Sequence, residues 1–272
     1  LFAARFPAGP CGRRLRQGLY PNHPYGYASL PECREIRSLS LAEVNRWIDR
    51  FVRLRHPYLI VTGDVSGTSF LQGLVAELSD PDYQTGQTVP REVSEPAERV
   101  VSVREGNLLL AGVRGPSIGR DEIEMLDIAE SLLGGRHGRL FQLLRVEESL
   151  VWSADFRGEA MAQGGIRYVE IRAGEEHLGE ASSRAISEVR RLAEANLPEP
   201  EYLSALVLTL TRFLERQQNP ELYLTDTMNM VLGGEPADYA RRYRLNVRQI
   251  RPGEVESAVR RYFGVPQQAG DR

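Results

Sequence analysis

The sequence predicts an α+β protein in which helices pack against one face of a mainly antiparallel sheet. Three segments carry apolar residues at helical spacing: Asp121–Leu133, Glu176–Ala195 and Glu201–Arg216. Four strand-like runs form two neighbouring pairs: 99–104 with 108–114, and 150–156 with 165–173. Short connections favour antiparallel pairing within each pair, and the long helices then cover the sheet.

The N-terminal third contains one helix with a clear start and one short strand. Ser40 and Glu43 form a capping box, in which Ser40 accepts from the backbone and Glu43 reaches back. An apolar helix face follows, and the helix is expected to end near His56. Residues 58–62 are typical of a buried strand, and the proline-bearing segment 81–97 is expected to be a linker.

The central stretch, residues 113–156, organises the rest of the chain. Its helical stripe starts at Asp121 and stops at the pair Gly134-Gly135, where a helix requires left-handed backbone. A second short helix ends near Arg145, and a strand is expected over 150–156. The unit is therefore helix, glycine stop, short helix and strand, with one arginine at its corner.

The C-terminal third is predicted to contain helices over Glu201–Arg216 and from Pro252 onward, and no element is predicted between them. One helix starts at Pro252, the helix position that a proline tolerates best. The helix over Glu201–Arg216 is expected to turn a stripe of large aliphatic side chains toward the core: Leu203, Leu206, Val207, Leu210 and Leu214.

Composition excludes several functional classes. Of 272 residues, 42% are hydrophobic and 26% charged, which is ordinary for a globular protein, and a net charge of −3 gives no basic footprint for nucleic acid. No apolar run approaches the roughly 20 residues that span a membrane.

Cys11 and Cys33 lack C-x-x-C spacing, so one disulfide or two inert thiols both stay open. The compartment also stays open between bacterial periplasm and cytoplasm. The chain begins with Leu1 rather than Met, so we expect a processed or longer product.

Three motifs follow one another along the chain. They are His23-Pro24-Tyr25-Gly26, then Leu59 to Val65, then Asp121, Leu133-Gly134-Gly135, Arg139-Leu140-Phe141 and Leu144-Arg145. Together they resemble the M16 metallopeptidases, the family of pitrilysin, insulinase and the mitochondrial processing peptidase. In the central stretch, Trp152 stands where the family usually has a tyrosine.

The resemblance implies two related domains in tandem, built from M16-type layers, with the first domain incomplete. Residues 1–80 would be the closing portion of the first domain, 81–97 the linker and 98–272 most of the second. An incomplete sheet exposes an edge. We therefore expect a second copy or another subunit to cover it.

The zinc motif of the family, H-x-x-E-H on a helix, is absent from this sequence. His177 comes closest, but Ala181 replaces the second ligand, and the other histidines are His23, His56 and His137. We therefore expect no catalytic residue and no metal ligand in this chain. Zinc is expected in a partner chain or a missing segment.

The resemblance also implies that Arg145 and Trp152 bind substrate, because the matching Arg and Tyr of active members contact the peptide near the scissile carbonyl. An arginine suits that role through its permanent charge and its fork of donors. Trp152 keeps an aromatic wall and an N–H donor, with a different reach. The alternative is that Arg145 pairs with Glu147 or Glu148 at the surface while Trp152 fills core.

Two functions stay open on this basis. The first is the zinc-free C-terminal half, or partner subunit, of an M16-type zinc metalloendopeptidase that closes a chamber and holds an extended peptide at a sheet edge. The second is a catalytically inactive M16-like scaffold for assembly or peptide binding, similar to core subunits of respiratory complexes. Whether the chain serves an enzyme is undecided, and the sequence does not name the substrate.

Overall fold

The chain divides into two compact units in the computed structural model, Leu1–Tyr27 with Glu92–Arg272 in one and Ala28–Arg91 in the other. The predicted linker over 81–97, His56 and most of the predicted strand over 58–62 lie outside the described residues. The structure describes residues 9–26, 33–51, 60–61, 69–78, 100–194, 196–236 and 238–264.

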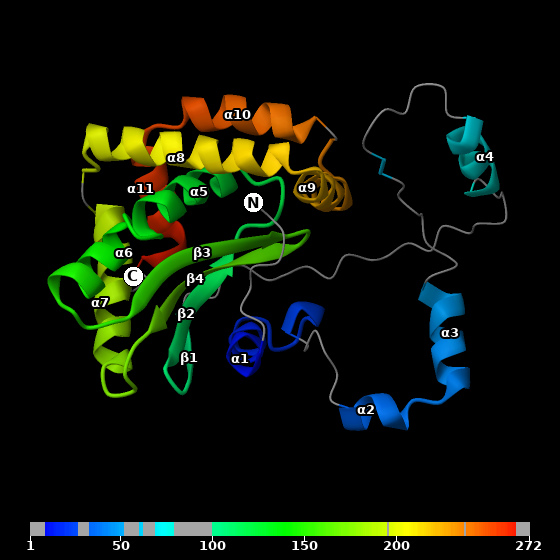
Figure 1. The fold of residues 1–272 in the computed structure, drawn as a ribbon, viewed down its shortest axis with the longest axis horizontal. Coiled ribbons are helices and arrows are strands. Elements are labelled where there is room, and N and C mark those ends of the chain that lie inside the picture. Colours follow the sequence, from blue (N-terminus) through cyan, green and yellow to red (C-terminus); the bar gives the residue numbers. More distant parts are fainter. Residues whose placement is uncertain are drawn as a thin grey trace, which may run out of the picture. The chain divides into compact units, whose positions relative to one another are not determined.

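A four-stranded antiparallel sheet forms the centre of the first unit (Figure 1). Its strands are β1 (Val101–Glu105), β2 (Leu108–Gly115), β3 (Ser153–Met161) and β4 (Gly164–Arg172), in the order β1-β2-β4-β3. Both predicted hairpins are confirmed, since β1 pairs β2 and β3 pairs β4. The tight turn between β1 and β2 uses Gly106 at φ 53°, a left-handed conformation that favours glycine.

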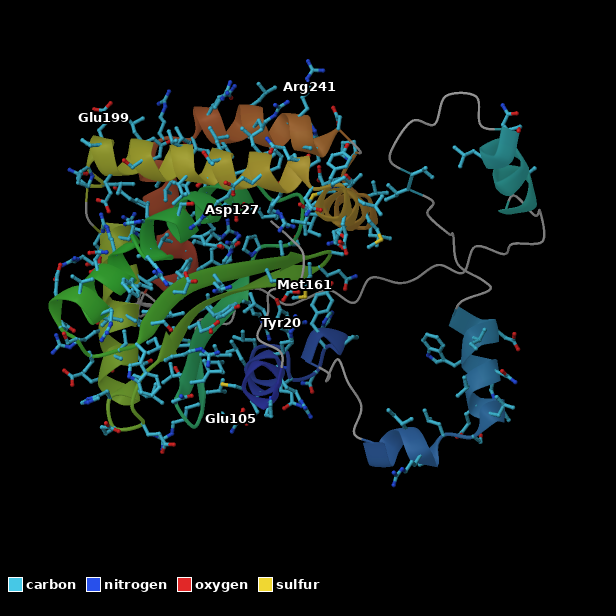
Figure 2. The ribbon with its side chains drawn as sticks, viewed as in Figure 1. Tyr20, Glu105, Asp127, Met161, Glu199 and Arg241 are labelled. Carbon is cyan, nitrogen blue, oxygen red and sulfur yellow. The ribbon has the colours of Figure 1, made fainter. Side chains whose placement is uncertain are left out.

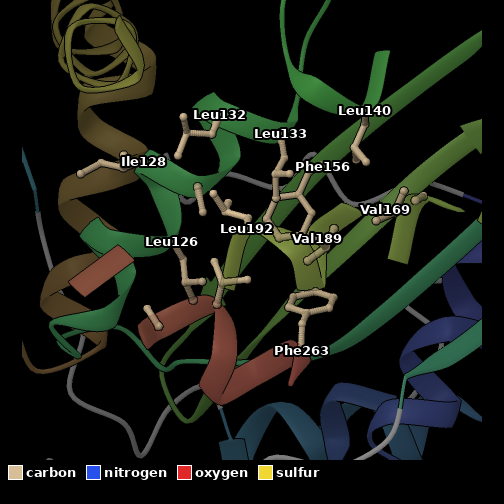
Figure 3. Packing of buried hydrophobic residues seen from close by; sticks show 14 of the residues in the cluster. Leu126, Ile128, Leu132, Leu133, Leu140, Phe156, Val169, Val189, Leu192 and Phe263 are labelled. Atoms are coloured by element: carbon tan, nitrogen blue, oxygen red, sulfur yellow. The ribbon is translucent and has the colours of Figure 1, made fainter. Parts of the chain in front are cut away.

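Three helices cover one face of this sheet: α5 (Glu122–Leu133), α7 (Leu178–Glu194) and α11 (Pro252–Phe263). Figure 3 shows their side chains meeting those of the strands, with Phe156 of β3 and Phe263 of α11 at 5.5 Å between ring centroids. Burying large apolar side chains such as these contributes roughly 1.5–3 kcal/mol each. The predicted α+β architecture, with helices on a face of an antiparallel sheet, is confirmed.

A second helical layer lies outside α5, and the sequence predicted it only in part. It consists of α8 (Glu199–Gln218), α9 (Pro220–Leu232) and α10 (Tyr239–Gln249) (Figure 1). The start of α9 is capped by Asn219, whose side chain accepts from the N–H groups of Glu221 and Leu222 at 3.0 and 3.1 Å. The sequence analysis did not predict α9 or α10.

The predicted inward face of α8 is right only in part. Leu206 and Leu210 are half-buried and pack against the core, whereas the other three predicted core residues are exposed: Leu203, Val207 and Leu214. The fully buried positions are Tyr202, Ala205, Thr209 and Phe213. Phe213 stacks on Tyr243 at 4.5 Å, the Tyr202 hydroxyl donates to a backbone carbonyl, and Thr209 Oγ1 lies 2.8 Å from Ser131 Oγ, so these contacts set the orientation of the helix.

Helix α1 (Pro10–Leu19) covers part of the opposite face, against β1 and β2 (Figures 1 and 2). The buried Tyr20 hydroxyl donates to Gly165 O at 2.6 Å and accepts from Gly165 N at 3.0 Å. Gly26 is required here because a Cβ would lie 2.0 Å from the Tyr20 carbonyl oxygen. Residues 9–26 therefore pack with the sheet, while the predicted domain division at 80 and 98 stays a prediction.

The second unit contains α2 (Cys33–Ser38), α3 (Leu41–Phe51) and α4 (Ser69–Leu78). The predicted capping box at α3 is confirmed: Glu43 Oε2 accepts from Ser40 N at 2.8 Å, and Ser40 Oγ accepts from Glu43 N at 3.3 Å. None of the described helices is both long and apolar enough to cross a membrane.

A buried polar network links α5 to the sheet. The guanidinium of Arg167, on β4, lies 3.1 Å from Asp127 Oδ1 and 3.3 Å from Glu130 Oε2. The Tyr243 hydroxyl of α10 donates to the other oxygen of Asp127 at 2.8 Å. A Cβ on Gly158 would lie 2.2 Å from Arg167 Nη1, so that glycine makes room for the buried arginine. Figure 2 shows Asp127 between the sheet and the outer helices.

Candidate functional site

The candidate site begins where α5 ends. The backbone N–H of Gly134 still donates to Glu130 O at 2.9 Å, and Gly135 then takes φ 77°, the left-handed stop that the sequence predicted. The N–H of Gly135 donates to Asp155 Oδ1 at 2.9 Å, which fixes the corner to β3. A Cβ at Gly138 would lie 2.2 Å from Gly134 O, so this glycine allows the close turn into the next helix.

The next helical segment changes its pitch before it ends. Helix α6 (Arg139–Phe141) runs into η2, a π-helix over Gln142–Glu147 that carries Arg145. The i→i+5 bond from Glu148 N to Leu143 O, at 3.1 Å, is part of this wider turn. Single π turns are often found at functional sites because they shift the following side chains by one position.

Backbone bonds hold the connection from η2 to β3 in one conformation. The carbonyl of buried Leu144 accepts from both Leu150 N and Val151 N, at 2.8 and 3.3 Å. Ser149 takes φ 53°, which costs a residue with a Cβ on the order of 1 kcal/mol and persists only where the surroundings require it. Trp152 N then donates to Arg172 O at 2.7 Å, and β3 begins at Ser153 rather than at the predicted residue 150.

Both predicted site residues are exposed on this rigid corner. Arg145 is exposed and has no ion pair within the described part of the chain. The alternative pairing is not what the structure shows, because Glu148 instead binds Arg184 at 2.5 Å. The alternative that Trp152 fills core is wrong, since this side chain is 58% exposed. The corner thus presents a free cation and a large aromatic ring from one short, fixed segment.

Arg139, the first residue of the Arg139-Leu140-Phe141 motif, has a different environment from Arg145. Its guanidinium donates to both oxygens of Glu201, at 2.5 and 2.7 Å, and lies 3.6 Å from Glu188. The hydrogen bond that Arg139 donates to Glu201 is the main cause that raises the pKa of Arg139. This arginine therefore joins α6 to α7 and α8 and is positioned to hold the corner in place.

Glu188 and Glu201 are neighbours of this corner that the sequence did not predict. They lie on α7 and α8, far along the chain, and only tertiary packing brings them to Arg139. One signal was available: Glu188 occupies a buried position on α7, at helical spacing from Ala185 and Leu192. A charged residue within an apolar stripe indicates a buried ionic contact.

The described histidines do not assemble a metal centre. Among the residues that the structure describes, no group of three or more His, Cys, Asp or Glu side chains could hold a metal ion. His177 is exposed at the start of α7, 3.6 Å from Glu176, and Ala181 in the second ligand position is buried. His23 lies in the aromatic contact with Tyr25, at 4.4 Å between centroids.

Comparisons with known proteins agree on one fold. The family model described as peptidase M16 inactive domain matches residues 38–210. The search of curated proteins found no match. Many solved structures are similar, and the three described next have low sequence identity, which shows the fold alone.

The first of these structures is the inactive peptidase domain of a Bordetella parapertussis protein described as a zinc protease, with TM-score 0.52, 18% identity and coverage of 60% of this chain and 88% of that one. The second is a peptidase M16 inactive domain from Pseudomonas fluorescens, with TM-score 0.70, 15% identity and coverage of 93% and 63%. The third is a chain of complex III2 from Candida albicans, with TM-score 0.52, 15% identity and coverage of 57% and 39%.

Proposed function

Because the chain belongs to the M16 peptidase family as one of its inactive domains, we propose that it completes a zinc metalloendopeptidase whose metal and general base lie in another chain or segment. In this role the chain closes the chamber and binds an extended peptide, together with a zinc-bearing M16 subunit or a second copy. The observation that carries the proposal is the corner at Arg145 and Trp152. Both side chains are exposed there, and neither contributes to the core.

The chemistry of the corner suits a peptide backbone. A guanidinium that has no carboxylate partner in the described part of the chain keeps its donors available for carbonyl oxygens. The indole ring of Trp152 can pack against the peptide, and its N–H can donate. The π-helix and the left-handed Ser149 hold these groups in place before substrate arrives, which reduces the entropy lost on binding.

Reconstitution with the zinc-bearing partner tests the proposal. Arg145→Ala should lower turnover of an unfolded peptide by roughly a hundredfold, the scale of a lost oxyanion donor. Folding should be nearly unchanged, because an exposed charge contributes little to stability. Arg248→Ala is the matched control, since it removes the same charge from an exposed position on α10. Equal turnover in the two variants would remove Arg145 from the proposed role.

A second candidate function is an inactive scaffold for assembly. The exposed aliphatic side chains of α8, Leu203, Val207 and Leu214, favour it, since a helix face of this kind is typical of a protein interface. The similar chain of complex III2 from Candida albicans points to the same class. On this alternative, neither Arg145→Ala nor Trp152→Tyr changes turnover, whereas Val207→Asp on α8 prevents the assembly that light scattering measures.

If the peptidase role is right, Trp152→Tyr restores the residue usual in the family, and turnover stays the same or rises.

A further inference from the structure

A cavity of about 320 Å³ lies in the outer helical layer, between the C-terminal part of α8, the first turn of α9 and the first turns of α10 (Figure 1). Its volume is at the small end of the range of ligand pockets, roughly 300–1,000 Å³. It shares no lining residue with the corner at Arg145, and the proposed function does not use it.

The three helices around this cavity are fixed to one another. Arg216 of α8 binds Asp226 of α9, with Nη2 2.6 Å from Oδ1, and both side chains are largely buried. Phe213 of α8 stacks on Tyr243 of α10 at 4.5 Å between ring centroids. These contacts are made within the protein, so the cavity exists before any ligand binds, which reduces the entropy lost on binding.

One side of the cavity is apolar. Leu214 of α8 and Tyr223 of α9 line it next to the buried Phe213. Leu214 is 43% exposed and Tyr223 is half-buried, so both have apolar surface that a ligand can cover. Removing such surface from water favours a ligand with an aromatic or aliphatic part.

The side formed by α10 is cationic. Arg241 and Arg244 line the cavity from positions three residues apart, so they share one face of the helix. Both are exposed, and neither has an ion pair within the described part of the chain. The carboxylate in the lining, Asp238, lies 3.6 Å from Arg242, which is outside the lining. Figure 2 shows Arg241 at the end of α10 that lies nearer to α9.

The charge and the donors of the lining favour an anion. Two guanidinium groups against one carboxylate leave one net positive charge. The Gln217 amide and the Tyr223 hydroxyl add two neutral donors that form no hydrogen bond among the residues described. A carboxylate accepts from guanidinium, amide and hydroxyl groups alike. An inorganic anion would satisfy the charge but leave the apolar side of the cavity uncovered.

We propose that this cavity binds a carboxylate attached to an aromatic or aliphatic group, of about the size of one amino-acid residue. The carboxylate binds Arg241 and Arg244, and the apolar part packs against Leu214 and Tyr223. Such a group belongs either to a free carboxylic acid or to the C-terminal residue of a peptide. Binding here is independent of the role proposed for Arg145.

The first test compares an acid with its amide on the whole chain. N-acetyl-phenylalanine has the carboxylate, and N-acetyl-phenylalaninamide keeps the ring without the charge. Isothermal titration and amide NMR shifts measure binding. We expect the acid to bind at least tenfold more tightly and to shift the amides of Tyr223, Arg241 and Arg244, because charged hydrogen bonds are lost with the amide. Acetate, which lacks the apolar part, should bind at least tenfold more weakly than the acid.

Two further probes distinguish the sources of the carboxylate. Phenylpropionate represents a free carboxylic acid, and acetyl-Ala-Ala-Phe with a free carboxyl end represents the end of a peptide. Tighter binding of phenylpropionate indicates a free acid, and tighter binding of the tripeptide indicates a peptide end. Either result supports the proposed chemistry.

Variants locate the binding. Arg244→Gln should weaken binding of N-acetyl-phenylalanine tenfold or more, with little effect on the amide. Leu214→Asp should weaken the acid to a similar extent, because it places a like charge on the apolar side. Both positions are exposed, so the variants should fold. Arg248→Gln is the matched control, since it removes the same charge from an exposed position outside the lining, one turn further along α10.

Three results would overturn the inference. The first is equal binding of N-acetyl-phenylalanine and its amide, and the second is an equal effect of Arg244→Gln and Arg248→Gln. The third is the absence of saturable binding by every carboxylate probe. None of these measurements uses peptidase turnover, so they separate this cavity from the role proposed for Arg145.

Discussion

Glu124 on α5 should make this protein less stable as the pH rises. Its side chain is almost fully buried, and its Oε1 accepts from the Tyr239 hydroxyl at 3.3 Å and from Asn246 Nδ2 at 3.4 Å. Burial, helped by the neighbouring charge of Asp127, raises the pKa of Glu124 from an ordinary value of 4.5 to about 7. The folded protein therefore holds a proton there that the unfolded chain has already released.

The sign and size of the effect follow from this difference in pKa. Between about pH 4.5 and pH 7 the folded state binds more protons at this position, so its stability falls as the pH rises and is constant above that range. One pKa unit corresponds to about 1.4 kcal/mol, so ionised Glu124 costs at most about 3.5 kcal/mol. Glu124→Gln removes this cost while keeping an acceptor for Tyr239.

Thermal unfolding of the wild type and Glu124→Gln at pH 5 and pH 8 measures the effect. At pH 5 the two proteins should unfold at similar temperatures. At pH 8 the variant should unfold higher by roughly 5–10 °C, since 1 kcal/mol corresponds to about 2–4 °C in a domain of this size. Comparing the two proteins cancels the titration of all other groups. The same difference at both pH values, or a variant that is less stable at pH 8, would refute the reasoning.

Three further predictions test other parts of the structure. Arg167→Met should lower the free energy of unfolding by about 3–5 kcal/mol in urea titrations, because it leaves the buried Asp127 and the half-buried Glu130 without their cation, and a loss below about 1 kcal/mol would contradict this. Gly26→Ala should cost on the order of 2 kcal/mol and speed amide exchange in α1, because its Cβ would press on the Tyr20 carbonyl; unchanged exchange would count against this anchor. Elemental analysis of the purified chain should find no stoichiometric zinc, and one tightly held zinc per chain would reverse the assignment of the metal to a partner.

The sequence predicted the turn that exposes Arg145 and Trp152, whereas the substrate-binding role of these residues stays a prediction. Arg145 and Trp152 were singled out from a local motif, and a local motif determines the glycine stop, the turn and the exposed corner. Glu188 was not predicted as a site residue, because its neighbours Arg139 and Glu201 come from other helices. Helical spacing on α7 marks Glu188 as a charged residue within an apolar stripe, but it does not reveal which residues of other helices contact it.

Helix α8 shows why helical spacing of hydrophobic residues did not suffice to predict which face of the helix is buried. Its leucines and its aromatic residues form competing stripes, and both satisfy helical spacing. The stripe that contains Phe213 is the more deeply buried one, because Phe213 stacks on Tyr243 and Thr209 forms a hydrogen bond with Ser131. Both partners lie on other elements, so hydrophobicity along α8 could not choose between the two faces.

The sequence by itself determined the elements whose signals are local: the capping box at Ser40, the glycine stop after α5 and the two hairpins. Neighbouring residues satisfy the hydrogen bonds and the backbone geometry of these features, so they can be read along the chain. Only the tertiary structure decided the features that need distant partners. These are the cover of α1 on the second sheet face, the buried Arg167 network and the cavity between α8, α9 and α10. Burial and charge pairing depend on what packing brings together, and that is not encoded at any one position.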